Sequence, residues 1–138
     1  MIRHATSRFA PASALLFLAL GALTSGAAFS ADALTAGQLA AAERVYTGTA
    51  SCEFNQQITL APVAAKPGHF TLVHKKASYT LVPQETTSGA VRLEDAKSGL
   101  VWIQIPAKSM LMNTKLGQRV ADVCITPEQR QAGLVAVN

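Results

Sequence analysis

Apolar and polar residues alternate with a period of two through most of this chain, in short segments separated by turn sequences. The segments 69–76 and 100–105 have this alternation, which puts successive side chains on opposite faces of a β-strand. Turn residues stand between the segments, as in the Lys-Pro-Gly-His sequence at 66–69. Because such short connections cannot join parallel strands, we expect an antiparallel meander.

The same pattern of strand segments and turn residues extends over residues 48–125. Seven or eight short strands in so few residues favour a small antiparallel β-barrel or sandwich over an open sheet, so the predicted fold class is mostly β. The predicted strands cover 48–54, 57–63, 69–76, 78–83, 90–94, 100–105, 109–113 and 119–125.

A helix is expected on either side of the strands. Thr35 and Gln38 have capping-box spacing ahead of strong helix formers, which predicts a short N-terminal helix over 36–44 within a lead-in over 31–46. After the β domain, 47–126, a Thr-Pro start predicts a helix in the tail, 127–138. We expect Gly133 to limit that helix to two turns.

The first 30 residues have the features of a secretory signal peptide. Arg3 and Arg8 precede a charge-free apolar run from Ala14 to Leu23, which is too short to span a bilayer. Small residues follow, and cleavage is expected near Ser30/Ala31. The mature protein is therefore expected to be periplasmic or secreted, with no membrane anchor.

The chain contains two cysteines, Cys52 and Cys124. Disulfides form in the oxidising compartments that exported proteins reach, so we predict one disulfide that joins the first strand to the last. A loop of this length stabilises a fold by roughly 4 kcal/mol in the chain-entropy model. No CxxC motif occurs, so thiol-disulfide catalysis is not indicated.

Composition and motifs argue against nucleic-acid binding and catalysis. Without residues 1–30, ten Lys or Arg oppose eight Asp or Glu, and the basic residues are scattered. No sequence motif of a hydrolase, a nucleotide-binding loop or a zinc protease is present. His69 and His74 are too few for a zinc site, which needs three or four ligands. We therefore expect no cofactor, no metal and no enzymatic activity.

A resemblance suggests what this domain binds. The order Cys52, Ser88-Gly89-Ala90, Trp102, Cys124 in an exported chain of short strands resembles the bacterial inhibitors of c-type lysozyme, the membrane-bound and periplasmic group called MliC and PliC. In that family a Ser-Gly-Ala loop and a Trp-containing strand bring a Ser and a Lys to the catalytic carboxylates of lysozyme. The resemblance implies contact roles for Ser88, Gly89 and Trp102.

The cation of the family pattern is displaced in this sequence. Two residues after Trp102 the chain has Gln104, so an ammonium would have to come from Lys108, or a guanidinium from Arg92. A hydroxyl and a cation on a rigid loop can form charge-assisted bonds to the carboxylates of a glycosidase. The predicted partner-binding residues are Ser88, Gly89, Arg92, Trp102 and Lys108.

The alternative hypothesis is a periplasmic structural or ligand-binding β domain that does not inhibit lysozyme. In that interpretation the apolar segments Val101 to Ile105 and Met110 to Met112 face a partner. The methionines also suit an adaptable core.

Overall fold

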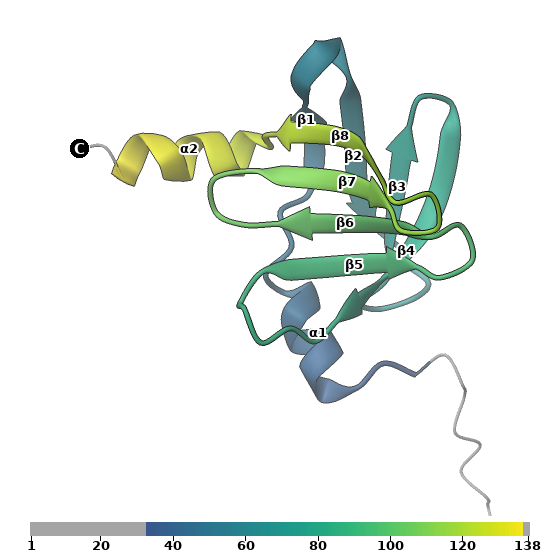
Figure 1. Cartoon of the computed structure of the whole chain (residues 1–138). Coiled ribbons are helices and arrows are strands. Elements are labelled where there is room, and N and C mark those ends of the chain that lie inside the picture. Colours follow the sequence, from purple (N-terminus) through teal and green to yellow (C-terminus); the bar gives the residue numbers. More distant parts are fainter. Residues whose placement is uncertain (1–32, 137–138) are drawn as a thin grey trace, which may run out of the picture. The chain divides into compact units, whose positions relative to one another are not determined.

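Eight antiparallel strands follow one another in the sheet order β1 to β8 in the computed structural model, which describes residues 33–136 (Figure 1). The predicted signal peptide, residues 1–30, lies outside the described residues. The elements are α1 (Ala36–Ala42), β1 (Gly48–Ser51), the 3-10 turn η1 (Glu53–Asn55), β2 (Gln57–Pro62), β3 (Phe70–His74), β4 (Ala77–Gln84), β5 (Val91–Asp95), β6 (Leu100–Gln104), β7 (Ser109–Asn113), β8 (Gln118–Cys124) and α2 (Pro127–Ala136).

The predicted mostly β fold and the meander are confirmed, with strand ends that differ by at most three residues. The largest difference is in β1, which was expected to reach residue 54 and ends at Ser51. The chain leaves the sheet there because Phe54 and Asn55 have left-handed backbone conformations, with φ of 56° and 57°. This left-handed backbone turns the chain out of the extended direction of β1.

The sheet curls into a nearly closed barrel, in which the end of β1 meets the end of β8. Ser51 N donates to Ile125 O at 3.1 Å, and Ile125 N donates to Ser51 O at 2.9 Å. The predicted disulfide between Cys52 and Cys124 is present next to this pair, with an S–S distance of 2.07 Å. The first and last strands are thus joined by a covalent bond and by backbone hydrogen bonds.

The core fills the inside of the barrel with the inward-facing residues of every strand. Trp102 on β6 is its largest side chain and has no exposed surface. Alternation along β6 puts Leu100, Trp102 and Gln104 on the inner face, so the polar Gln104 lies at the end of an apolar row. The other fully buried apolar side chains include Ile58, Leu60, Leu72, Leu81, Leu93 and Leu111.

Helix α1 packs against the end of β4 and fixes where the chain enters the barrel. The predicted capping box is confirmed: Gln38 N donates to Thr35 Oγ1 at 3.1 Å, and Thr35 N donates to Gln38 Oε1 at 2.9 Å. The same Gln38 side chain donates from Nε2 to Pro83 O on β4 at 2.9 Å. Helix α1 therefore directs residues 43–47 across one end of the barrel.

Helix α2 is longer than the sequence indicated. The expectation of at most two turns is wrong, because α2 continues through Gly133 to Ala136. A glycine inside a helix costs only about 1 kcal/mol, and the first turn of α2 is firmly held. Gln129 N donates to Thr126 Oγ1 at 3.2 Å, and Gln129 Nε2 donates to Ile105 O at 2.8 Å. Within residues 33–136, neither helix has the length and apolar character needed to cross a membrane.

Candidate functional site

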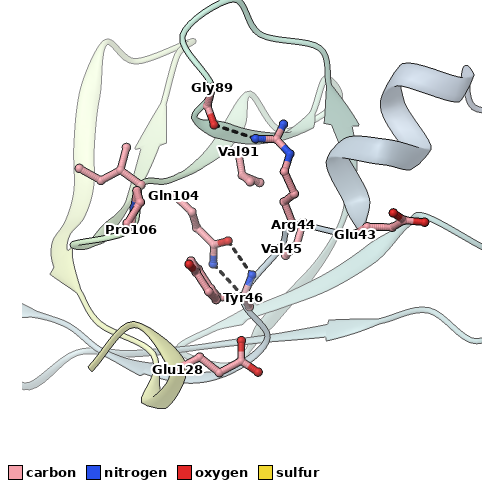
Figure 2. A pocket seen from close by; sticks show the side chains of 10 residues that line it. Glu43, Arg44, Val45, Tyr46, Gly89, Val91, Gln104, Pro106 and Glu128 are labelled. Atoms are coloured by element: carbon pink, nitrogen blue, oxygen red, sulfur yellow. Dashed lines mark hydrogen bonds between the residues drawn. The ribbon is translucent and has the colours of Figure 1, made fainter. Parts of the chain in front are cut away.

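Three chain segments meet at one end of the barrel. Successive connections of a meander alternate between the two ends, so the β4–β5 loop (85–90) and the β6–β7 loop (105–108) share an end. The connection from α1 to β1 (43–47) crosses the same end. Together these segments and the start of α2 line an open hollow of about 360 Å³ (Figure 2). We call this region the Ser88 end.

Gln104 closes the Ser88 end from inside. Its side-chain amide pairs twice with the backbone of Tyr46: Tyr46 N donates to Gln104 Oε1 at 3.0 Å, and Gln104 Nε2 donates to Tyr46 O at 2.8 Å (Figure 2). The side-chain amide thus bonds to Tyr46 as the backbone of a neighbouring β-strand would. Gln104 is only 1% exposed, so at the position where the resemblance implied a Lys this chain has a structural residue that presents no group to a partner.

The Ser88-Gly89 loop is exposed and is fixed by three hydrogen bonds. Arg44 Nη1 donates to Gly89 O at 2.8 Å, Thr86 Oγ1 donates to Ala90 O at 2.7 Å, and Ala90 N donates to Ser88 Oγ at 3.3 Å. Gly89 has φ of +79°, where a side chain would strain the backbone, although no atom would obstruct a Cβ. The Ser88 hydroxyl is thus held at the surface with its O–H able to donate.

The charges that line the hollow are mixed. Arg44 contributes a guanidinium, and Glu43 and Glu128 contribute two carboxylates (Figure 2). Two carboxylates beside one guanidinium disfavour a small anion in the hollow itself. The exposed loop beside the hollow is therefore the better candidate for contact with a partner.

Lys108 lies on a loop at the Ser88 end, but its ammonium is bound to Asp122 on β8. Lys108 Nζ donates to Asp122 Oδ1 at 3.1 Å, and Arg119 Nη1 donates to Asp122 Oδ2 at 2.9 Å. A third bond comes from Val123 N at 2.7 Å. This backbone bond first, and then the bond from Lys108, hold the pKa of the Asp122 carboxyl below its ordinary value. The charge of Lys108 is thus already paired with a carboxylate of this chain, which weakens its attraction for a carboxylate of a partner.

Arg92 is also ion-paired, and it lies on the outer face of β5. Its guanidinium forms an ion pair with Glu94, two residues along β5. Val91 points inward and lines the hollow at the Ser88 end, whereas the next side chain, Arg92, leaves the opposite face of the strand. Arg92 is therefore not gathered with Ser88, and the structure does not bring the three predicted polar groups into one cluster.

Trp102 requires a correction. The resemblance implied a contact role, but the indole is completely buried in the core. Its Nε1 has no hydrogen-bond partner among the described residues. Trp102 can support the shape of the barrel, but it cannot touch a partner from this position.

The outer face of β6 and β7 has an apolar strip, which is the surface of the alternative hypothesis. Cross-strand pairs join Val101 to Met112 and Ile103 to Met110. Val101 is buried, and the other three are half-buried. Ile105 continues the strip at 40% exposure. The strip is mostly covered by neighbouring side chains, so it offers less apolar area than its sequence suggests.

Neither of the two described histidines lines the hollow at the Ser88 end. His69 Nδ1 lies 3.3 Å from Pro67 O, and His74 Nε2 lies 2.9 Å from Gln56 Oε1. Burial first, and then the charge of Lys75, lower the pKa of His74. Among residues 33–136, no three His, Cys, Asp or Glu side chains are grouped as a metal site would require.

Comparisons with protein-family models, with curated proteins and with solved structures found no match to this chain. The resemblance to the lysozyme inhibitors thus rests on the short sequence motifs and stays a prediction.

Sequence reasoning missed Arg44, the cation that donates a hydrogen bond to the Ser88-Gly89 loop. Arg44 follows the predicted N-terminal helix and had no motif attached to it. A signal for Gln104 did exist: it is a polar residue at an inward position of an alternating strand, and such residues need an internal partner.

Proposed function

We propose that this protein is an exported binding protein that blocks the cleft of a glycosidase of the c-type lysozyme class with its Ser88-Gly89 loop. It performs no chemistry of its own. The observation that carries the proposal is an exposed Ser-Gly turn held at the barrel end by Arg44.

Rigidity supports this proposal. A loop that is ordered before binding loses less conformational entropy when it enters a cleft. Thr86 and Arg44 both bond to carbonyl groups of the loop, and neither bond uses the Ser88 hydroxyl. The loop can therefore present that hydroxyl without rearrangement.

Arg44 is the cation that we assign to the contact. Only one of its five N–H groups bonds to Gly89 O, and the side chain is exposed. The remaining N–H groups can donate to a carboxylate, and such charge-assisted bonds are stronger than neutral ones. Lys108 and Arg92 are less suitable because each already pairs with a carboxylate of this chain.

The test is a titration of hen lysozyme activity on a cell-wall suspension with the purified, disulfide-bonded protein. We expect stoichiometric inhibition by the wild type. The Ser88→Ala and Arg44→Gln variants should each need about tenfold more protein for half inhibition, which corresponds to one lost polar contact. Ser78→Ala is the matched control, since Ser78 is exposed on β4, away from the loop.

Two results would contradict the proposal in different ways. No inhibition at a large molar excess of wild-type protein would exclude lysozyme as the target. Inhibition that survives both Ser88→Ala and Arg44→Gln would exclude this loop as the contact. If inhibition were instead lost on Met110→Gln, the apolar strip would be the binding surface.

A further inference from the structure

A second group of exposed side chains lies at the opposite end of the barrel from the Ser88 end. The β1–β2 connection, which contains η1, and the β3–β4 turn lie side by side there, at the top of Figure 1. Ile58 pairs with His74 across β2 and β3, and Gln56 Oε1 lies 2.9 Å from His74 Nε2. We call this region the Phe54 end.

The Phe54 end carries an open polar hollow of about 400 Å³. Its lining combines three carboxamides, one imidazole and one ammonium. Carboxamides both donate and accept hydrogen bonds, as the hydroxyl groups of a ligand require. The lining residues are Asn55, Gln56, Gln57, His74 and Lys75.

An exposed aromatic residue adjoins the lining residues in the sequence. Phe54 precedes Asn55 and is 86% exposed, which is unusual for a side chain that normally contributes to a core. An exposed apolar ring can pack against the C–H face of a sugar ring, and neighbouring amides can bind the hydroxyls of that sugar. The ammonium of Lys75 adds a preference for a negative charge.

The backbone at this end is strained in a way that stability alone does not favour. Phe54 has φ of 56°, and Lys75 has φ of 56°. Glycine adopts this conformation freely, and asparagine tolerates it, but Phe and Lys do so at a cost. Cys52, at the start of η1, is bonded to Cys124, and Cys52 N donates to Gln56 O at 2.8 Å across the turn. Strained residues of this kind gather at binding sites.

We propose that the Phe54 end binds an acidic oligosaccharide, a sugar chain that bears carboxylates. Phe54 contacts a ring face, the carboxamides bind hydroxyls, and Lys75 binds a carboxylate. This inference does not depend on the Ser88-Gly89 loop, because no residue is shared between the two ends.

His74 is suited to this role in its neutral form. A carboxamide oxygen only accepts, so the Nε2 of His74 carries the proton that Gln56 Oε1 receives. The Nδ1 atom is then left as an acceptor for a hydroxyl. The lowered pKa of His74 agrees with a neutral imidazole at pH 7.

The test is a titration of the ¹⁵N-labelled, disulfide-bonded protein with hexagalacturonate, followed by amide chemical shifts. We expect shifts confined to residues 53–57 and 74–76. The Phe54→Gly and Lys75→Gly variants should fold, because glycine relieves the strain, and should bind about tenfold more weakly. The matched control is Lys76→Gln, which removes the same charge from a residue that does not line the hollow.

Three results would overturn the proposal: no shifts in these segments, unchanged affinity of the two glycine variants, or an equal loss in Lys76→Gln, which would mean unspecific charge attraction. Equal affinity for uncharged cellohexaose would contradict the claim that the site selects sugars with carboxylates. Titrations with soluble peptidoglycan fragments and with delipidated lipopolysaccharide distinguish two sources of such sugars. Ser88→Ala should leave every one of these affinities unchanged, which separates this site from the proposed inhibition.

Discussion

The two ends of the barrel are ordered by different means. At the Ser88 end, side chains bond to the backbone of neighbouring segments: Arg44 to Gly89, Gln104 to Tyr46 and Gln129 to Ile105. At the Phe54 end, Phe54 in the 3-10 turn after the disulfide-bonded Cys52 and Lys75 in the β3–β4 turn have a left-handed backbone that their side chains do not favour. Substitutions should therefore lower stability at the first end and can raise it at the second.

Removal of the disulfide is expected to have the largest effect. The double variant Cys52→Ala/Cys124→Ala frees a loop with a sequence separation of 72 residues, and should lose about 4 kcal/mol of unfolding free energy. Urea unfolding of the variant and the oxidised wild type measures the difference. A loss below about 1 kcal/mol would mean that hydrogen bonds alone hold the seam between β1 and β8.

At the Ser88 end, Gln104→Leu should lower the free energy of unfolding by about 2 kcal/mol. The substitution leaves the backbone N–H and C=O of Tyr46 without their partner in a partly buried position. The control is Gln57→Leu, because Gln57 is exposed and lies outside this network. Equal stability of the two variants in urea unfolding would show that the Gln104–Tyr46 pairing does not hold this end.

At the Phe54 end, Lys75→Gly should raise the unfolding free energy by about 0.5–1 kcal/mol, since glycine adopts a positive φ without strain. Lys76→Gly should have the opposite sign, because Lys76 does not have a positive φ and glycine only adds entropy to the unfolded chain. Thermal unfolding of both variants checks the contrast. A loss of stability in Lys75→Gly would contradict the claim that substitutions at the Phe54 end can raise stability.

The smallest effect concerns pH and His74. Its folded pKa lies below the ordinary value of 6.5, so the unfolded state binds the proton more readily. The stability that this residue contributes is present above about pH 6.5 and is lost as the pH falls from there toward the folded pKa. His74→Gln should flatten this part of the stability profile. If the unfolding free energy of His74→Gln changed between pH 7 and pH 5 as steeply as that of the wild type, groups other than His74 would cause the pH dependence.

The fold could be predicted largely because its signals are local. Alternation and turn residues lie within a few positions of one another, and the capping box of Thr35 and Gln38 is complete within four residues. The disulfide could be predicted because the chain has two cysteines, which allow a single pairing. Even so, the length of α2 was underestimated, because the bonds of Gln129 to Ile105 and Ser109 come from residues distant in sequence.

The candidate site could be predicted only in part, since it depends on contacts between segments far apart in the chain. The Ser88-Gly89 turn was visible in the sequence as a turn. That Lys108 meets Asp122, that Arg92 meets Glu94, and that Trp102 faces the core depend on register and on which face of each strand is buried. Alternation fixes two faces but does not say which one is inside.

The most direct test of the proposed inhibition maps where lysozyme contacts the barrel. Addition of unlabelled hen lysozyme to the ¹⁵N-labelled, disulfide-bonded protein should shift or broaden the amides of residues 86–90 and of Arg44, and leave residues 53–57 unaffected. No change at equimolar lysozyme, or changes confined to β6 and β7, would contradict the assignment of the Ser88-Gly89 loop as the inhibitory contact.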